Sequence, residues 1–320
     1  MKSTEMLSPR ARVLGAALRD ARVGARFGLR ELARRIGRAP GHVSNWESGS
    51  RVPAVEDVGG VLGALGVTGE VKKWILALAF GAVGPDWFTA GPQSSPGHFA
   101  ALVAHERAAA SMTVWAPVVI PDLLQIPDYA RLTCDAKAFS SEKLDEHVEA
   151  RMRRRGALFG GDPVPAEFFI GDEAIRHPLA DEEVMLRQLR FIVDTATMSR
   201  SIGVRVLRRR DPRNAVLVGA FATFMMDDSP PVVYCPHYNM GAFLVNEHAG
   251  SYTRATPLLR RTALSRGESI DWLNREVRRL AGSLESQRDL DDLTPLSVLA
   301  GEVTAGRARV ETTARPTGRT

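Results

Sequence analysis

The chain has 320 residues, 44% of them hydrophobic and 25% charged, which is enough for about two domains with buried cores. Two distant cysteines exclude a disulfide-rich scaffold, and no apolar run reaches the roughly 20 residues that span a bilayer. The first residues do not show the continuous apolar core of a secretory signal, so we expect a cytoplasmic protein without a membrane partner. The net charge of +5 is unevenly distributed along the chain. Residues 1–80 hold 13 Lys and Arg against 7 Asp and Glu, and the other 240 residues hold 29 against 30. A basic N-terminal part favours a nucleic-acid partner.

Apolar residues at helical spacing predict a compact all-α domain in the N-terminal part. Three segments carry them at i, i+3, i+4 and i+7, and Val43 and Trp46 lie one turn apart between the second and the third. The three sets are Leu14, Ala17, Leu18 and Ala21; Leu29, Leu32, Ala33 and Ile36; and Val58, Val61, Leu62 and Leu65. Helices this short are marginally stable alone, so we expect them to pack on one another.

The spacing of Gly37 and Pro40 predicts a helix-turn-helix. Gly37 suits the left-handed position after a helix that starts at Gly28, and Pro40 suits the first turn of the next helix. With this geometry the second helix can enter the major groove of DNA and present its leading turn to base edges. The candidate base-contacting residues are Pro40, Gly41, His42, Ser44 and Asn45, and the candidate phosphate-binding residues around them are Arg30, Arg34, Arg38 and Arg51.

The segment from Gly28 to Val67 resembles the Cro/C1-type (XRE) helix-turn-helix family, and WESGSRVP at residues 46–53 is similar to that family's ending. The resemblance implies a five-helix domain over residues 1–82 that binds double-stranded DNA as a homodimer. It assigns structural roles to three residues: Trp46 in the core, Glu47 as a structural carboxylate and Gly49 at the end of the recognition helix. Three departures from the family pattern weaken base-specific reading: Leu29 in place of a polar residue, Ala39 in place of a capping Ser or Thr, and Gly41, which has no side chain.

After a Pro-, Gly- and Ser-rich linker at residues 83–97, helical and strand-like patterns alternate. Helices are predicted at 98–112, 122–134, 141–159, 181–198, 252–265 and 268–284, and strands at 166–171, 202–207, 219–226 and 230–235. This mixed order predicts an α+β domain at residues 98–285 with a mainly antiparallel sheet. Residues 286–320 are polar and without a period, so we expect a disordered tail.

The run VWAPVVIPDLLQIPDYAR at residues 114–131 resembles the signature of DUF5753, a domain of unknown function that follows this type of helix-turn-helix in many actinobacterial regulators, the WhiJ-like proteins among them. Further matches follow in order, such as HERAA at 105–109 and EARMRRRGALF at 149–159, and the likeness covers residues 98–280. The resemblance implies a sensor or interaction domain, whose partner is a small protein of the DUF397 type or a small-molecule effector. Asp122 departs from the signature, which has Gly there.

The second domain offers few residues for chemistry, and no cofactor, metal or catalytic residue is predicted. Phosphate loops, dinucleotide fingerprints and zinc spacings are absent, and His98 and His105 are two helical turns apart, too far to share one ion. Cys235 and His237 could form a nucleophile pair, but a buried cysteine beside a loop histidine is the favoured interpretation. The basic run at 151–156 is interpreted as a solvated helix face rather than a phosphate site. The candidate ligand-pocket residues are Trp115, Tyr234, Cys235 and His237.

The favoured hypothesis is a DNA-binding transcriptional regulator whose C-terminal domain binds a partner protein or a small ligand. The first alternative is an enzyme or ligand-binding protein of a biosynthetic pathway that has kept a regulator scaffold and lost base reading. The second alternative is an antitoxin-like interaction module.

Overall fold

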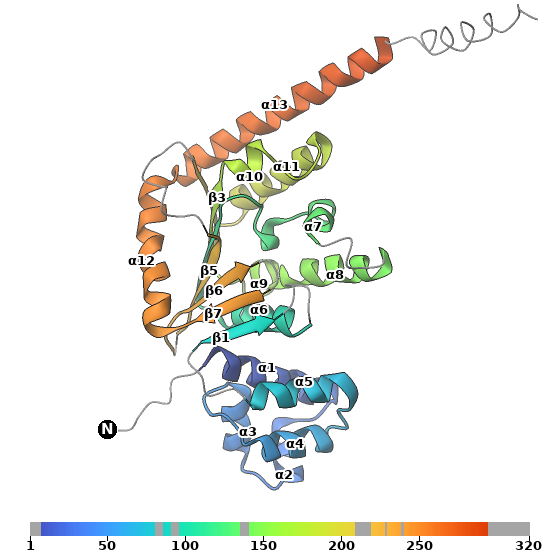
Figure 1. The fold of residues 1–320 in the computed structure, drawn as a ribbon, viewed down its shortest axis with the longest axis vertical. Helices are drawn as coiled ribbons and strands as arrows, with labels where there is room; N and C mark the ends of the chain where they lie inside the picture. Colours follow the sequence, from blue (N-terminus) through green and yellow to red (C-terminus); the bar gives the residue numbers. More distant parts are fainter. Residues whose placement is uncertain are drawn as a thin grey trace, which may run out of the picture.

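The computed structural model describes residues 8–80, 86–90, 96–134, 141–208, 219–227, 229–237 and 240–293. A helical N-terminal domain packs against one end of a larger α+β domain, and a long helix projects from the opposite end (Figure 1). This arrangement confirms the predicted α+β class with an all-α domain in front.

The N-terminal domain consists of five helices within residues 8–80: α1 (Pro9–Gly24), α2 (Leu29–Arg35), α3 (Pro40–Glu47), α4 (Val55–Ala64) and α5 (Gly69–Ala79). Ser8 caps α1 by accepting a hydrogen bond from the Ala11 N–H at 3.1 Å. The predicted apolar stripes supply the core, where Leu14, Leu62 and Val58 are fully buried. Helix α1 approaches the end of α3 closely, because a Cβ at Gly15 would lie 2.5 Å from the Trp46 carbonyl oxygen.

The α+β domain contains a mixed sheet of seven strands, in the order β1-β7-β6-β5-β2-β3-β4. The strands are β1 (Trp87–Ala90), β2 (Ser111–Ala116), β3 (Ala166–Gly171), β4 (Ile202–Leu207), β5 (Phe221–Met225), β6 (Val232–His237) and β7 (Met240–Leu244). Strands β2, β3 and β4 run parallel to one another, and the remaining neighbours are antiparallel. The prediction of a mainly antiparallel sheet is therefore confirmed.

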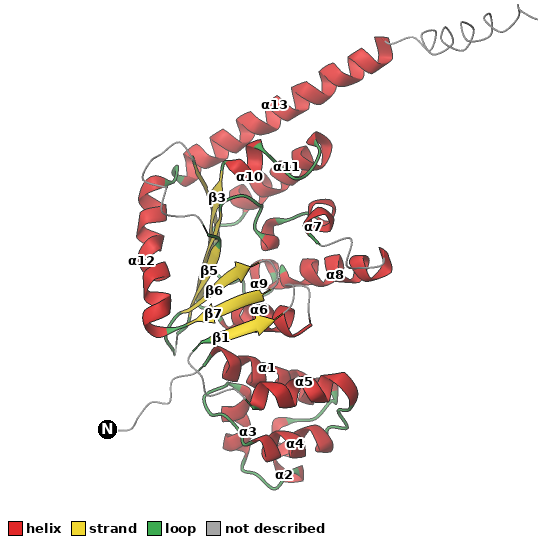
Figure 2. Ribbon diagram, viewed as in Figure 1, coloured by secondary structure: helices red, strands yellow, loops and turns green. Residues whose placement is uncertain are grey.

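Helices cover both faces of this sheet, as Figure 2 shows. They are α6 (Pro96–Ala108), the 3-10 helix η1 (Asp122–Leu124), α7 (Pro127–Thr133), α8 (Ser141–Arg154), α9 (Gly156–Phe159), α10 (Glu173–Arg176), α11 (Glu182–Met198), α12 (Asn246–Thr262) and α13 (Arg266–Leu293). Because side chains alternate along a strand, Trp115 and Phe169 join Leu259 of α12 in one cluster, whereas Met112 and Phe168 belong to the main core on the opposite face.

Several elements differ from the predicted ones. The segment interpreted as a linker contains β1, which pairs antiparallel with β7, and the helix expected to reach residue 112 ends at Ala108. Strand β2 then begins at Ser111, because its residues form the centre of the sheet between β5 and β3. Helix α13 continues to Leu293, past the predicted start of the tail at 286, and residues 294–320 lie outside the described part of the chain.

The two domains share one continuous apolar core at the junction of α1 and α6. The main cluster includes Ala11 and Leu14 of α1 together with Ala101 and Leu102 of α6. Arg12 adds a polar contact by donating a hydrogen bond to the Ser229 hydroxyl at 2.8 Å. The N-terminal domain thus packs on the second domain through the contact between α1 and α6 (Figure 1).

Candidate functional site

The turn between α2 and α3 has the geometry that the sequence predicts. Gly37 has φ +65°, and the Arg38 N–H bonds the Ala33 carbonyl at 2.9 Å, which closes α2 with a left-handed residue. Ala39 then adopts an extended conformation at the N-cap of α3 without a side-chain cap, and Pro40 is the first helical residue. The missing cap is therefore a real departure, but the helix forms nevertheless.

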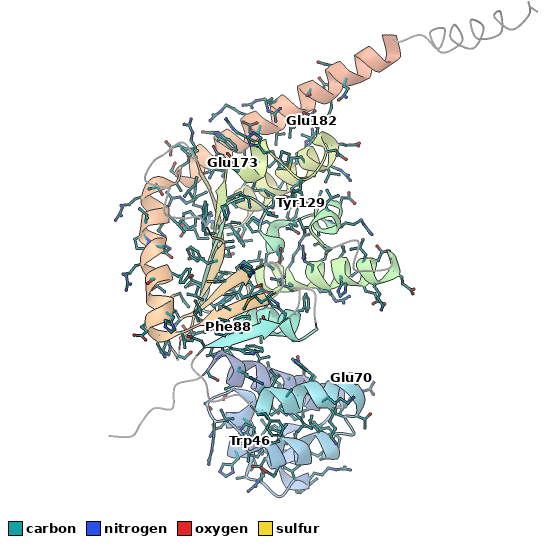
Figure 3. The ribbon with its side chains drawn as sticks, viewed as in Figure 1. Trp46, Glu70, Phe88, Tyr129, Glu173 and Glu182 are labelled. Carbon is teal, nitrogen blue, oxygen red and sulfur yellow. The ribbon has the colours of Figure 1, made fainter. Side chains whose placement is uncertain are left out.

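The leading turn of α3 faces solvent. All nine candidate DNA-contacting residues are exposed: Arg30, Arg34, Arg38, Pro40, Gly41, His42, Ser44, Asn45 and Arg51. The opposite side of α3 is anchored by Val43 and Trp46, which are 2% and 4% exposed, and Figure 3 shows Trp46 inside the helical domain. Helix α3 therefore presents one polar face outward and holds the other in the core, which is the arrangement that groove insertion requires.

A largely buried ion pair holds α3 to α1. Arg22 donates to both carboxylate oxygens of Glu47 at 2.7 and 2.8 Å, and a third N–H bonds the Phe27 carbonyl at 2.9 Å. The hydrogen bonds from Arg22 to Glu47 raise the pKa of the guanidinium. Gly49, with φ +76°, follows the end of α3. The structural roles implied for Glu47 and Gly49 agree with these contacts.

The arginines around α3 are not equivalent. Arg38 donates to the Asp57 carboxylate of α4 at 2.5 and 3.0 Å, so part of its charge is already matched. Among the described residues, Arg30, Arg34 and Arg51 have no carboxylate partner within ion-pair distance. These three are therefore better placed than Arg38 to meet a phosphate.

A cavity of about 750 Å³ lies in the second domain, between the β2–β5–β6 part of the sheet and the segments η1, α7 and α8. Of the four candidate pocket residues, Tyr234, Trp115 and His237 border it. Cys235 does not border it, because its side chain packs in the cluster beneath α12 and hydrogen-bonds Tyr252. Burial raises the pKa of the Cys235 thiol, so the sulfur stays protonated at neutral pH. The nucleophile pair with His237 thus gains no support.

An ion-pair network that the sequence analysis missed forms one wall of the cavity. Arg154 binds Glu106 in a bidentate manner, at 3.0 Å through Nε and 2.5 Å through a terminal nitrogen, and donates to Asp122 at 3.1 Å. The Arg154 and Glu106 side chains are only 6% and 4% exposed. Burial raises the pKa of Glu106 although Arg154 opposes this shift. The interpretation of the basic run as a solvated helix face is wrong for Arg154.

Arg151, one turn before Arg154, extends the same network. It donates to Gln125 Oε1 at 2.9 Å and to Thr133 Oγ1 at 2.6 Å, and lies 3.6 Å from an Asp122 oxygen. Burial disfavours the charge of Asp122, but Arg151 and Arg154 outweigh this effect and lower the pKa of its carboxyl group. Asp122, the residue that replaces the signature glycine, therefore accepts a hydrogen bond from Arg154 and forms an ion pair with Arg151.

The buried histidines of α6, His98 and His105, do not line the cavity, and they do not form a metal site. His98 Nε2 is 2.7 Å from the Tyr234 hydroxyl, whereas His105 stacks on Phe243 and its Nδ1 is 2.7 Å from the Ala101 carbonyl oxygen. Within the described residues, no three His, Cys, Asp or Glu side chains are grouped so that they could hold an ion. No helix in the same part of the chain has the length and apolar character to cross a bilayer.

Comparisons with known proteins assign both parts of the chain. Residues 13–74 match a helix-turn-helix domain, and residues 99–275 match the domain of unknown function DUF5753. The chain is similar to the clp gene regulator ClgR from C. glutamicum, at 33% identity over 25% of this chain and 96% of that one, with a TM-score of 0.20. No curated protein matches it. The helix-turn-helix supports a DNA-binding regulator, and the chain belongs to the DUF5753 family.

Proposed function

We propose that this protein is a transcriptional regulator that binds double-stranded DNA through α3 and adjusts this binding through its DUF5753 domain. The observation that carries the proposal is the exposed leading turn of α3 within a matched helix-turn-helix domain. Asn45 can form two hydrogen bonds with an adenine edge, and His42 and Ser44 can each bond a base or a phosphate. Arg30, Arg34 and Arg51 supply the phosphate contacts that fix the helix in the groove.

The charge distribution supports the same proposal. Residues 1–80 carry the whole positive surplus of the chain, and a protein that neutralises phosphates loses affinity steeply as salt rises. A single helix-turn-helix reads only a short half-site, so we infer a homodimer on a two-fold symmetric operator, with the two α3 helices about one DNA turn apart.

Fluorescence anisotropy with the DNA upstream of the gene tests the proposal. We expect a complex at low salt, and a slope of log affinity against log salt of roughly one unit per phosphate contact. Asn45→Ala should weaken specific binding by about 1–3 kcal/mol and leave binding to unrelated DNA nearly unchanged. Arg153→Ala is the control, because Arg153 is an exposed arginine of the other domain. Absence of a complex at low salt contradicts the proposal.

A further inference from the structure

The cavity of the DUF5753 domain has one apolar and one polar wall. The sheet supplies the apolar wall, which includes Met112, Val114, Phe168, Ala222 and Phe224. The opposite wall supplies Asp122, Thr133, Arg151 and Arg154 from η1, α7 and α8. A volume of about 750 Å³ is in the range of pockets that enclose small organic molecules.

The charges of the polar wall are already balanced. Two guanidinium groups, Arg151 and Arg154, meet two carboxylates, Glu106 and Asp122, and the bidentate contact occupies both oxygens of Glu106. A charged ligand would therefore meet no formal charge left to pair with its own in this wall, and burying an unpaired charge is costly. Neutral groups can still exchange hydrogen bonds with the partly exposed Asp122 carboxylate and with Arg151.

The open side of the cavity is mainly apolar, although the exposed His237 also borders it. Val118, Leu132 and Leu179 border the cavity and remain 60%, 49% and 60% exposed, although they come from three separate segments. The hydroxyl of Tyr129, a residue labelled in Figure 3, accepts a hydrogen bond from the Ile120 N–H at 3.3 Å and so fixes the loop that carries Val118. Exposed apolar side chains at the opening of a cavity with an apolar wall indicate a ligand that is apolar over most of its surface.

Helix α6 connects the cavity with the DNA-binding domain. Leu102 and Glu106 border the cavity, while the same helix packs against α1 in the shared core. Helix α1 in turn holds α3 through the Arg22–Glu47 pair and the close approach at Gly15. A ligand that changes the position of α6 therefore acts on the element that positions the recognition helix.

We propose that this cavity binds an uncharged, largely apolar small molecule with one hydrogen-bonding end, and that α6 couples its binding to DNA affinity. The inference rests on the proposed function, because it names the chemistry of the effector and the route of its action.

Two fluorescent compounds with the same ring system test the ligand chemistry. N-phenyl-1-naphthylamine is neutral, and 8-anilinonaphthalene-1-sulfonate adds one sulfonate to it. We expect the full-length protein to bind the neutral compound saturably, with one site per chain, and the sulfonate at least about tenfold more weakly. Equal affinity for both, or no saturable binding of the neutral compound, overturns the proposal.

A cavity-filling variant locates the site. Ala222→Trp places a large side chain into the cavity from the sheet wall, and Ala108→Trp places the same side chain at an exposed position of α6. We expect Ala222→Trp to abolish binding of the neutral compound and Ala108→Trp to retain it, with circular dichroism confirming that both are folded. Binding that survives in a folded Ala222→Trp protein overturns the assignment to this cavity.

DNA anisotropy with and without the neutral compound tests the coupling. We expect a several-fold change in DNA affinity for the wild type and none for Ala222→Trp, and by linkage DNA must change the affinity for the compound by the same factor. Saturation without any change in DNA affinity overturns the coupling through α6. If the wild type fails to bind DNA in the absence of the compound, this result contradicts the proposed function instead. The failure of the coupling and the failure of the proposed function are therefore distinguishable.

Discussion

The two domains use arginine in opposite ways. Around α3, Arg30 and Arg34 are exposed and free of carboxylates within the described structure, so their charge is directed at solvent and at a polyanion. In the DUF5753 domain, Arg151 and Arg154 are each 8% exposed and bound to carboxylates. The comparison teaches that a basic run must be interpreted together with the charge around it. Residues 1–80 carry a surplus of +6, whereas the other 240 carry −1 and supply the carboxylates that pair with Arg151 and Arg154.

The largest expected effect comes from removing a buried arginine. Arg154→Met leaves Glu106 buried without its partner, and we expect a loss of about 3–5 kcal/mol in the free energy of unfolding, measured by urea denaturation. Glu106→Leu added to Arg154→Met should recover most of this loss. Arg153→Met is the control, since this neighbouring side chain is 72% exposed and should change stability by less than about 0.5 kcal/mol. A small effect of Arg154→Met would mean that the pair is not sequestered from water.

A second expected effect concerns the pH dependence of stability and His105, one of the two buried histidines of α6. Burial lowers the pKa of His105 from 6.5 to about 4, with a small further contribution from Arg12, so the unfolded chain binds the proton more readily than the folded one. The neutral His105 therefore costs no stability above about pH 6.5. As the pH drops from 6.5 towards 4, its protonation in the unfolded chain lowers the free energy of unfolding by up to roughly 3 kcal/mol. Urea unfolding at several pH values should show a shallower decline for His105→Phe. Parallel curves for the two proteins would assign the acid sensitivity to other groups.

A smaller effect distinguishes two arginines of the DNA-binding domain. Arg34→Ala should lower the salt slope of DNA binding by about one unit, whereas Arg38→Ala should change it less, because the Asp57 carboxylate already pairs with Arg38. The Arg38→Ala protein should also lose less than about 1 kcal/mol of stability, since this pair is exposed. Equal slopes for the two variants would show that Arg38 exchanges Asp57 for a phosphate.

A modest gain in stability is expected at the start of α3. Ala39→Thr supplies the missing acceptor for the free N–H groups of the first turn and should stabilise the protein by about 0.5–2 kcal/mol. Ala39→Val has nearly the same shape without the oxygen and serves as the control. The melting temperature should decrease in the order Ala39→Thr, wild type, Ala39→Val. Any other order would mean that a side-chain cap does not determine the stability of the first turn of α3.

Local signals predicted the DNA-binding surface well, because its geometry depends on neighbouring residues. The helical stripes, the left-handed Gly37 and the leading Pro40 are each readable within a few positions of the chain. Strands β1 and β7 could not be predicted in this way. Both are short, and β1 depends on β7 about 150 residues away, as the register between Trp87 and Phe243 shows. Strand β7 also pairs with the neighbouring β6, but its five residues give too short a pattern to be recognised.

The cavity wall could not be predicted either, because its ion pairs join distant segments. Glu106 and Arg154 are 48 positions apart, and no spacing links them. One signal was present: Leu144, Val148 and Arg151 follow each other at i, i+4 and i+7, so Arg151 continues the buried stripe of α8. An arginine in line with an apolar stripe predicts a buried partner, which here is the Asp122 site.

The common core of α1 and α6 has a consequence for how the chain can be divided. A fragment that ended before α6 would expose part of the apolar face of α1 to water, so we expect the isolated DNA-binding part to be less stable than in the full chain. Swapping this helix-turn-helix for another would therefore require the graft to include a matching surface for α6. Calorimetry should accordingly record a single melting transition for both halves rather than two.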